Sequence, residues 1–221
     1  MIVRPLIEPI LLAVALTNFA VLGTSRMTAC VRMLAMQGAL LGVLSIAVER
    51  PLSVHSIALG AGTVAVKALG LPWFLRWAMR EAAVRREVEP VIGYMASLLL
   101  GALVVGVSFA VASRLPGMVP GQGGSAPGGL LVPIALATLL SGLLVLITRS
   151  KAITQVVGYL MLENGIYLFG LTLVGRISFL VEIGVLLDVF VAVFIMGIVV
   201  FHINREFDSI SAENLVELRE A

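Results

Sequence analysis

Residues 130–174 read LLVPIALATLLSGLLVLITRSKAITQVVGYLMLENGIYLFGLTLV, which is two long apolar runs joined by a short basic turn. Each run supplies close to the ~20 residues that an α-helix needs to cross a bilayer. Because the bilayer core holds no water, a helix is favoured there, since it satisfies its own backbone hydrogen bonds. The stretch therefore predicts a transmembrane helical hairpin with Arg149 and Lys151 in its turn.

The rest of the chain repeats this composition. Of the 221 residues, 60% are hydrophobic and 13% are charged, and the mean hydropathy is +1.09. A soluble domain of this size needs more polar surface. We therefore expect an all-α polytopic membrane protein with about seven transmembrane helices. The expected spans are residues 5–23, 28–48, 53–77, 90–113, 130–148, 153–174 and 178–203.

Composition also limits the possible functions. The formal net charge of +2 is too small to indicate a nucleic-acid partner. With Cys30 as its one cysteine and only His55 and His202, the chain lacks the ligand clusters that metal, haem or iron–sulfur centres use. We expect no cofactor and no active site in this chain, so that any redox chemistry belongs to other subunits.

The distribution of basic residues predicts the orientation. With seven spans, the side of the 149–151 turn collects Arg26, Arg32, Arg76, Arg80, Arg85, Arg86, Arg149, Lys151, Arg205 and Arg219. The opposite side collects Arg4, Arg50, Arg114 and Arg176. Cytoplasmic loops are the ones enriched in Lys and Arg. The N-terminus is therefore expected outside and the C-terminus in the cytoplasm.

The chain divides into four parts by its pattern. They are an N-terminal three-helix unit with a charged cytoplasmic extension (1–89), a connector helix with a Gly/Pro-rich outer loop (90–129), a C-terminal three-helix unit (130–204) and a cytoplasmic tail (205–221). In each three-helix unit a very short basic turn joins the first two spans. Aligning Ser25-Arg26 with Thr148-Arg149 superposes the units, which predicts a parallel repeat.

Three ionisable side chains, Lys67, Glu163 and Asp188, lie near the middle of apolar spans. Ten residues from a helix end correspond to about 15 Å of depth. A charge there costs at least ~2.5–3.5 kcal/mol, and such residues mark ion and proton pathways. An apolar surrounding favours the neutral form of a carboxylic acid, which lets it exchange protons near neutral pH. We predict a proton path of Glu163, Asp188 and Lys67, with Glu182 as a further step nearer the outer side.

Static roles are the alternative for each of these groups. Asp188 could belong to a static buried ion pair or an interhelical hydrogen bond, and Glu163 could likewise have a static role. Lys67 could extend towards the membrane surface or pair with an acid of another subunit. Glu182 could be an interfacial group, and we interpret Asn164 as a helix–helix contact.

The second half of the chain resembles a known family. The motifs are Arg149-Ser-Lys-Ala, Gly158-Tyr-Leu-Met-Leu-Glu-Asn-Gly, and Val181-Glu-Ile-Gly followed by Asp188. They are similar to those of hydrogenase-4 component E, a membrane subunit of group 4 [NiFe] hydrogenases and formate hydrogenlyase-type complexes. The C-terminal half is in turn similar to the K-type subunit of respiratory complex I and to the C-type subunit of multisubunit Na+/H+ antiporters.

The resemblance implies a non-catalytic subunit in the membrane arm of such a complex, in a bacterial or archaeal cell membrane. It implies large antiporter-like membrane subunits and peripheral hydrogenase and iron–sulfur subunits as partners, with the [NiFe] centre and clusters in the latter. K-type subunits carry membrane acids on their second and third helices, and Asp188 matches the third-helix acid. The second-helix position falls at Leu160, whereas this chain has Glu163 nearly one helical turn later. The alternatives are a subunit of a cation/proton antiporter and a structural assembly subunit with statically paired charges.

Overall fold

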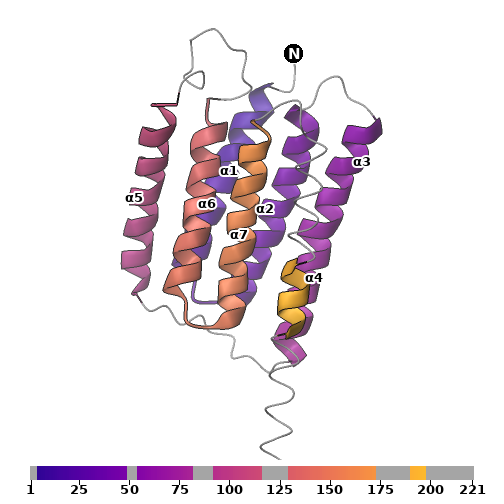
Figure 1. The fold of residues 1–221 in the computed structure, drawn as a ribbon, viewed down its shortest axis with the longest axis vertical. Helices are drawn as coiled ribbons and strands as arrows, with labels where there is room; N and C mark the ends of the chain where they lie inside the picture. The colour runs from indigo at the N-terminus through magenta and orange to yellow at the C-terminus, as the bar shows by residue number, and fades with distance from the viewer. Residues whose placement is uncertain (1–3, 49–53, 82–91, 116–128, 173–189, 198–221) are drawn as a thin grey trace, which may run out of the picture.

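A computed structural model of the chain describes residues 4–48, 54–81, 92–115, 129–172 and 190–197. The described part is all-α, and its helices stand side by side as an upright bundle (Figure 1). The elements are α1 (Arg4–Gly23), α2 (Met27–Val48), α3 (Val54–Thr63), the π-helix η1 (Val64–Gly70), α4 (Leu71–Glu81), α5 (Tyr94–Ala112), α6 (Leu131–Thr148) and α7 (Ala152–Gly170). Residues 190–197 form a further helical segment.

Four helices of the described part, α1, α2, α5 and α6, are long and apolar enough to cross a membrane. This finding confirms the all-α, membrane-type composition of the fold. The number of about seven spans stays a prediction, because four helices of the described part meet these requirements and residues 173–189 and 198–203 lie outside the described residues.

The expected span 53–77 is built from three successive elements, α3, η1 and α4. The π-helix covers seven residues with Lys67 at its centre. At its end the Leu71 N–H donates to the carbonyl of Val66, five residues earlier. Pro72 follows directly, and a proline can neither donate to the helix ladder nor fit closely against the preceding turn. The wider turns thus lie where the regular α-helical ladder is interrupted, and they carry the lysine.

The α6–α7 hairpin is held together at glycines. A Cβ atom added at Gly158 would lie 2.7 Å from the backbone nitrogen of Leu146, and Cβ atoms at Gly142 and Gly165 would collide with the backbone of the facing helix. Such close approach of helix backbones is how small residues join helices in a membrane. The two helices therefore form the rigid support on which α7 presents its polar residues.

Two apolar clusters fill the interior and leave a layer between them. One contains Leu22, Leu34, Leu75, Val145 and Met161, and the other contains Leu11, Leu41, Ile134, Ala135 and Leu168. On each of α1, α2, α6 and α7 the second cluster and the first occupy opposite ends of the helix. Buried polar residues lie between them on all four helices. We call this level the polar layer.

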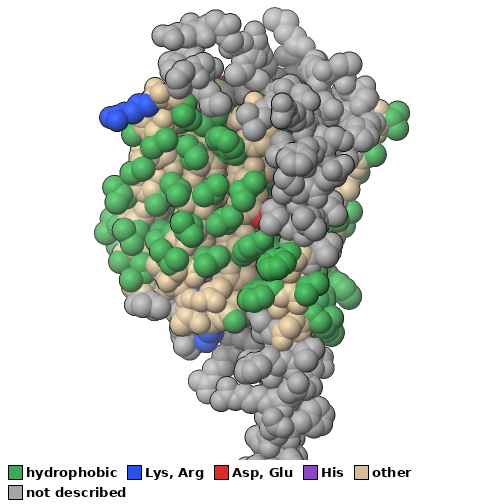
Figure 2. Space-filling model, in the orientation of Figure 1, with side chains coloured by type: hydrophobic (Ala, Val, Ile, Leu, Met, Phe, Trp, Pro, Cys, Tyr) green, Lys and Arg blue, Asp and Glu red, His purple; other side chains and the backbone are tan. Residues whose placement is uncertain are grey.

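The outer surface suits lipid. Figure 2 shows hydrophobic side chains spread over the face formed by α5 and its neighbours, with cationic side chains near the upper and lower edges. Large apolar side chains of α5, including Met95, Leu99 and Leu103, are exposed. Because exposing such an apolar face to water is unfavourable in free energy, this face is better suited to contact with lipid.

Several predictions fall outside the described residues. These include Glu182 and Asp188, the charged extension beyond Glu81, residues 116–128 of the outer loop, and the tail from residue 205. The α1–α2 and α6–α7 turns lie at the same end of the bundle (Figure 1), as a parallel repeat requires. The repeat itself stays a prediction.

Candidate functional site

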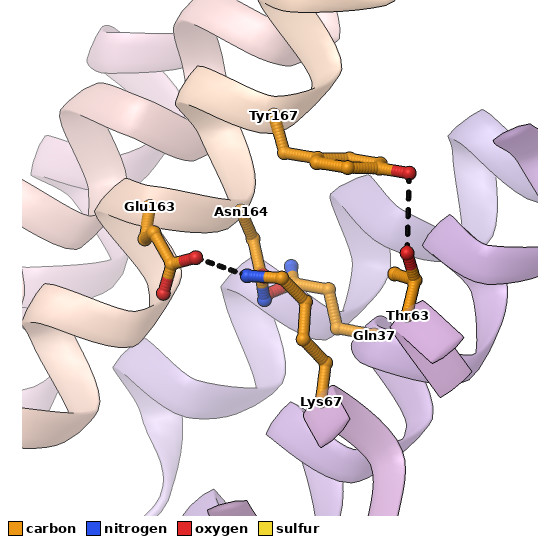
Figure 3. Close-up of polar contacts among 6 residues, drawn as sticks. All are labelled: Gln37, Thr63, Lys67, Glu163, Asn164 and Tyr167. Atoms are coloured by element: carbon orange, nitrogen blue, oxygen red, sulfur yellow. Dashed lines mark hydrogen bonds and ion pairs between the residues drawn. The ribbon is translucent and has the colours of Figure 1, made fainter. Parts of the chain in front are cut away.

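The centre of the polar layer is an ion pair between Lys67 of η1 and Glu163 of α7 (Figure 3). The Lys67 Nζ donates to Glu163 Oε1, and the side chains are only 6% and 2% exposed, respectively. A lone charge buried in this way is strongly unfavourable, whereas a paired charge is tolerated. The structure therefore brings together two of the four residues predicted for the proton path, from opposite halves of the chain.

Two further residues of α7 surround the ammonium group. Asn164 presents Oδ1 to Lys67 Nζ at 3.4 Å, and Nζ lies 5.9 Å from the centre of the Tyr167 ring. Tyr167 in turn lies with its hydroxyl 3.5 Å from Thr63 Oγ1 on α3, as Figure 3 shows. Carboxylate, amide oxygen and the face of an aromatic ring all attract a cation. This part of the site is thus built to hold positive charge on Lys67.

A chain of amide hydrogen bonds continues from Asn164 across the bundle. Its Nδ2 donates to Gln37 Oε1 at 2.9 Å. Gln37 Nε2 then donates to Thr17 Oγ1 at 3.0 Å and to Asn18 Oδ1 at 2.9 Å, and Asn18 Nδ2 donates to Thr138 Oγ1 at 2.9 Å. All five residues are buried. The polar layer therefore links η1 and α7 through α2 to α1 and α6.

A small cavity reaches the site from the end of the bundle that holds the α6–α7 turn. It offers about 10 Å³ for water centres and is lined by Val31, Leu34, Lys67, Leu71, Pro72, Leu75, Leu160 and Asn164. That volume is near the minimum for a single water molecule. Lys67 and Asn164 supply polar partners for such a water. Lys67 thus borders a space in which a proton donor or acceptor can lie.

The arrangement can move a proton between two well-defined atoms. With the proton on Lys67 Nζ the pair is ionic, and after transfer to Glu163 Oε1 it is a neutral amine and a neutral acid. In a low-dielectric interior the energies of these two states lie closer together than in water, because solvation no longer favours the charges. A buried Lys–Glu pair of this kind can therefore serve as a relay.

Sequence reasoning missed most of the polar layer. It singled out Lys67 and Glu163 because they are ionisable, and it interpreted Asn164 only as a helix–helix contact. It passed over Gln37 and Asn18, although each is an uncharged amide near the middle of an apolar span. Such amides are the sequence signal that could have predicted the hydrogen bonds of the polar layer, since they too need buried partners.

Arg149 lies apart from this layer, at the end of α6. Although it was expected as a loop charge of the cytoplasmic side, it is 2% exposed. Its Nη2 donates to the carbonyl of Leu22 at 2.9 Å, and its guanidinium carbon lies 5.5 Å from the centre of the Tyr94 ring. Burial lowers the pKa of Arg149, while the nearby Tyr94 and Cys30 act in the opposite direction. An arginine stays charged even so, and here it satisfies a carbonyl of the last turn of α1.

The described residues contain no group of three or more His, Cys, Asp or Glu side chains that could hold a metal ion.

The known proteins to which the chain is similar include two relatives from different organisms. The chain is 36% identical over 194 residues to Uncharacterized protein Rv0085 of Mycobacterium tuberculosis, which covers 87% of this chain and 86% of that protein. It is 29% identical over 159 residues to Hydrogenase-4 component E of Escherichia coli, which covers 72% of this chain and 71% of that protein. No family model matches the chain, and no solved structure matches it significantly. The chain therefore belongs to the same family as Uncharacterized protein Rv0085 and is a homologue of Hydrogenase-4 component E.

Proposed function

We propose that the chain is a non-catalytic membrane subunit of a hydrogenase-type complex and that Lys67 and Glu163 form one step of a proton path through it. The observation that carries the proposal is the ion pair between these two residues, buried within the polar layer. Homology to Hydrogenase-4 component E supports the kind of complex. Burying two charges in an apolar bundle weakens a fold unless the charges are used or well paired.

The relay works in three steps. The Lys67 ammonium group passes a proton from Nζ to Oε1 of Glu163, which leaves a neutral amine and a neutral acid. Glu163 then releases this proton towards the next acceptor, for which Asp188 and beyond it Glu182 are the candidates. A water in the small cavity passes a proton on to the amine and takes up another from the aqueous phase in its place, which restores both the ion pair and the water. One proton has then moved for each cycle, and no other atom is consumed.

The proposal includes the setting of the subunit. Its partners are large antiporter-like membrane subunits and peripheral hydrogenase and iron–sulfur subunits, which hold the [NiFe] centre and the clusters. The N-terminus faces the outside and the C-terminus faces the cytoplasm. In this setting the redox reaction of the partners supplies the energy, and the chain contributes a passage for protons.

Purification from native membranes in mild detergent tests the kind of complex. The tagged chain is recovered, its partners are identified by mass spectrometry, and nickel and iron are measured. We expect [NiFe] and iron–sulfur subunits to purify together with the chain. Recovery of antiporter-like membrane subunits alone, without nickel, would contradict the proposal and favour the cation/proton antiporter.

Proton pumping tests the relay. Lys67→Met and Glu163→Gln are made in the complex, and the protons moved for each H2 turned over are measured in inverted membrane vesicles. Both changes should abolish most pumping while the complex still assembles, because each removes one end of the transfer. Lys151→Met is the matched control, since Lys151 lies at the start of α7, about three helical turns from Glu163. Normal pumping by both site variants would assign the ion pair a static role.

A further inference from the structure

The hydrogen bonds of the polar layer all run in one direction, which starts at the ammonium group. Lys67 Nζ can only donate when it is charged, so the atom of Asn164 that faces it is the oxygen. The amide nitrogen of Asn164 is then left to donate to Gln37, whose own oxygen must face it. In the same way the nitrogen of Gln37 faces the oxygen of Asn18. One charge therefore sets the orientation of three amides in succession.

The hydroxyl groups at the far end of the hydrogen-bond series are consistent with this direction. The Thr138 hydroxyl gives its hydrogen to the carbonyl of Ile134 at 2.8 Å, and the Thr17 hydroxyl gives its hydrogen to the carbonyl of Val14 at 2.6 Å. Both hydroxyl oxygens are then acceptors only, and both accept from the amides. A reversed chain of amides would turn the oxygens of Asn18 and Gln37 towards these two hydroxyl oxygens, and each hydroxyl would have to give up its bond to the backbone carbonyl. The far end thus favours the same orientation.

The geometry points to Gln37 and Asn164 as positioning residues for Lys67, joined through Asn18 to a hydrogen-bond chain whose oxygen ends hold the ammonium group at Glu163. This inference rests on the proposed function, because it assigns the residues that keep the relay loaded with its proton.

The physical effect is electrostatic. Each amide turns the negative end of its dipole towards Lys67 Nζ, and hydrogen bonds in series polarise one another in a dry interior. This series of amide hydrogen bonds therefore stabilises positive charge on the ammonium group. The groups that also face Nζ include the Glu163 carboxylate and the Tyr167 ring, both on α7. Because the amides come from α1 and α2 as well, they tie the state of the relay to the packing of the N-terminal half.

Substitution at Gln37 separates this role from simple packing. Gln37→Met keeps the length of the side chain but replaces the amide oxygen that faces Asn164 by a thioether sulfur, which accepts only weakly, whereas Gln37→Glu keeps an oxygen there. Proton pumping for each H2 turned over is measured in inverted vesicles from the intact complex. Gln155→Met is the matched control, because Gln155 bonds to the carbonyl of Arg149 outside the polar layer. The amount of assembled complex is measured for every variant.

We expect Gln37→Met to lower pumping roughly tenfold, Gln37→Glu to retain most of it, and Gln155→Met to match the wild type. If Gln37→Met pumps as well as Gln37→Glu, packing suffices and the inference is wrong. Thr138→Val provides a second test if Gln37→Met does not assemble. This change keeps the shape of the side chain and removes the hydroxyl that is the terminal acceptor, together with its bond to Ile134. We expect pumping to fall by a factor of about two to three, whereas wild-type pumping would overturn the inference.

The same variants distinguish a failure of the Lys67–Glu163 relay from a failure of the role assigned to the amides. If Lys67→Met and Glu163→Gln both pump normally, the relay itself is wrong. If those two variants fail to pump while Gln37→Met is normal in an assembled complex, the relay stands and only the role of the amide chain is lost.

Discussion

Gln37 of α2 and Asn164 of α7 share a hydrogen bond of 2.9 Å across the middle of the bundle, and this bond joins the two halves of the chain. Asn164 directly follows Glu163 on α7. Of these two successive residues, Asn164 joins the series of amide hydrogen bonds, and Glu163 is the carboxylate of the ion pair. Successive residues on a helix point about a quarter-turn apart. Both can therefore reach Lys67, because the lysine lies between the faces they present.

The ion pair should show strong coupling in stability. Lys67→Met alone leaves the carboxylate of Glu163 buried without its cation, and we expect a loss of about 3–5 kcal/mol. Glu163→Gln alone likewise leaves the ammonium group of Lys67 buried without its counter-charge. The double variant should unfold closer to the wild type than either single variant, because no uncompensated charge remains. Thermal unfolding of the purified protein in detergent measures all three.

The control for this cycle combines Glu163→Gln with Lys151→Met. Lys151 lies in the turn before α7, away from the polar layer, so the two effects should add. If the double variant Lys67→Met, Glu163→Gln also shows the plain sum of its single effects, the pair contributes no coupling and its charges are compensated elsewhere.

Glycine positions of the α6–α7 hairpin should be intolerant of even one methyl group. In Gly142→Ala the new Cβ would collide with the backbone of Leu162, which cannot move independently of α7. We expect a loss of about 1–3 kcal/mol, as for other overpacked interiors. Gly106→Ala on α5 is the matched control, because nothing lies within 4 Å of its Cβ position. That change should be neutral or stabilise by up to about 1 kcal/mol through helix propensity.

The unfolding temperatures of these two glycine variants decide the matter. A Gly142→Ala protein as stable as Gly106→Ala would mean that α6 and α7 lie farther apart than in the structure. The support of the Glu163 side chain would then need a different explanation.

Arginine at position 149 should not be replaceable by lysine. The planar guanidinium donates to the Leu22 carbonyl and stacks over Tyr94 at the same time, which a lysine ammonium cannot do. We expect Arg149→Lys to cost about 1–3 kcal/mol in thermal stability. Arg26→Lys, at the exposed residue of the corresponding α1–α2 turn, should leave stability unchanged. Equal effects of the two changes would show that only the positive charge matters.

Orientation in the membrane is testable with single cysteines. Cys30 is buried and should resist a membrane-impermeant maleimide, so it can remain in place as the background. Ser25→Cys places an exposed thiol in the α1–α2 turn, and Ser113→Cys places one at the opposite end, after α5. We expect labelling of Ser113→Cys in intact spheroplasts and of Ser25→Cys only in inverted vesicles. The opposite pattern would reverse the predicted orientation.

Much of the fold could be predicted from local pattern. The boundaries of α1, α2, α5 and α6 fall within a few residues of the expected spans, because uninterrupted apolar runs leave a helix as the way to satisfy the backbone in lipid. The π-helix around Lys67 could not be read in this way. Its wide turns depend on how Pro72 and the close contact of Gly38 with the Lys67 backbone are accommodated together.

The sequence by itself determined that this is an all-α protein of membrane-type composition. It also determined that Lys67 and Glu163 lie in the middle of apolar spans, where a charge is energetically costly. It did so because hydropathy and helix length are local properties. Only the tertiary structure decided that these two residues meet, and that Gln37, Asn18 and Thr138 stand behind them in a directed chain. Pairing across the bundle depends on which helix faces touch, and close packing at glycines sets those faces over distances that no local pattern records.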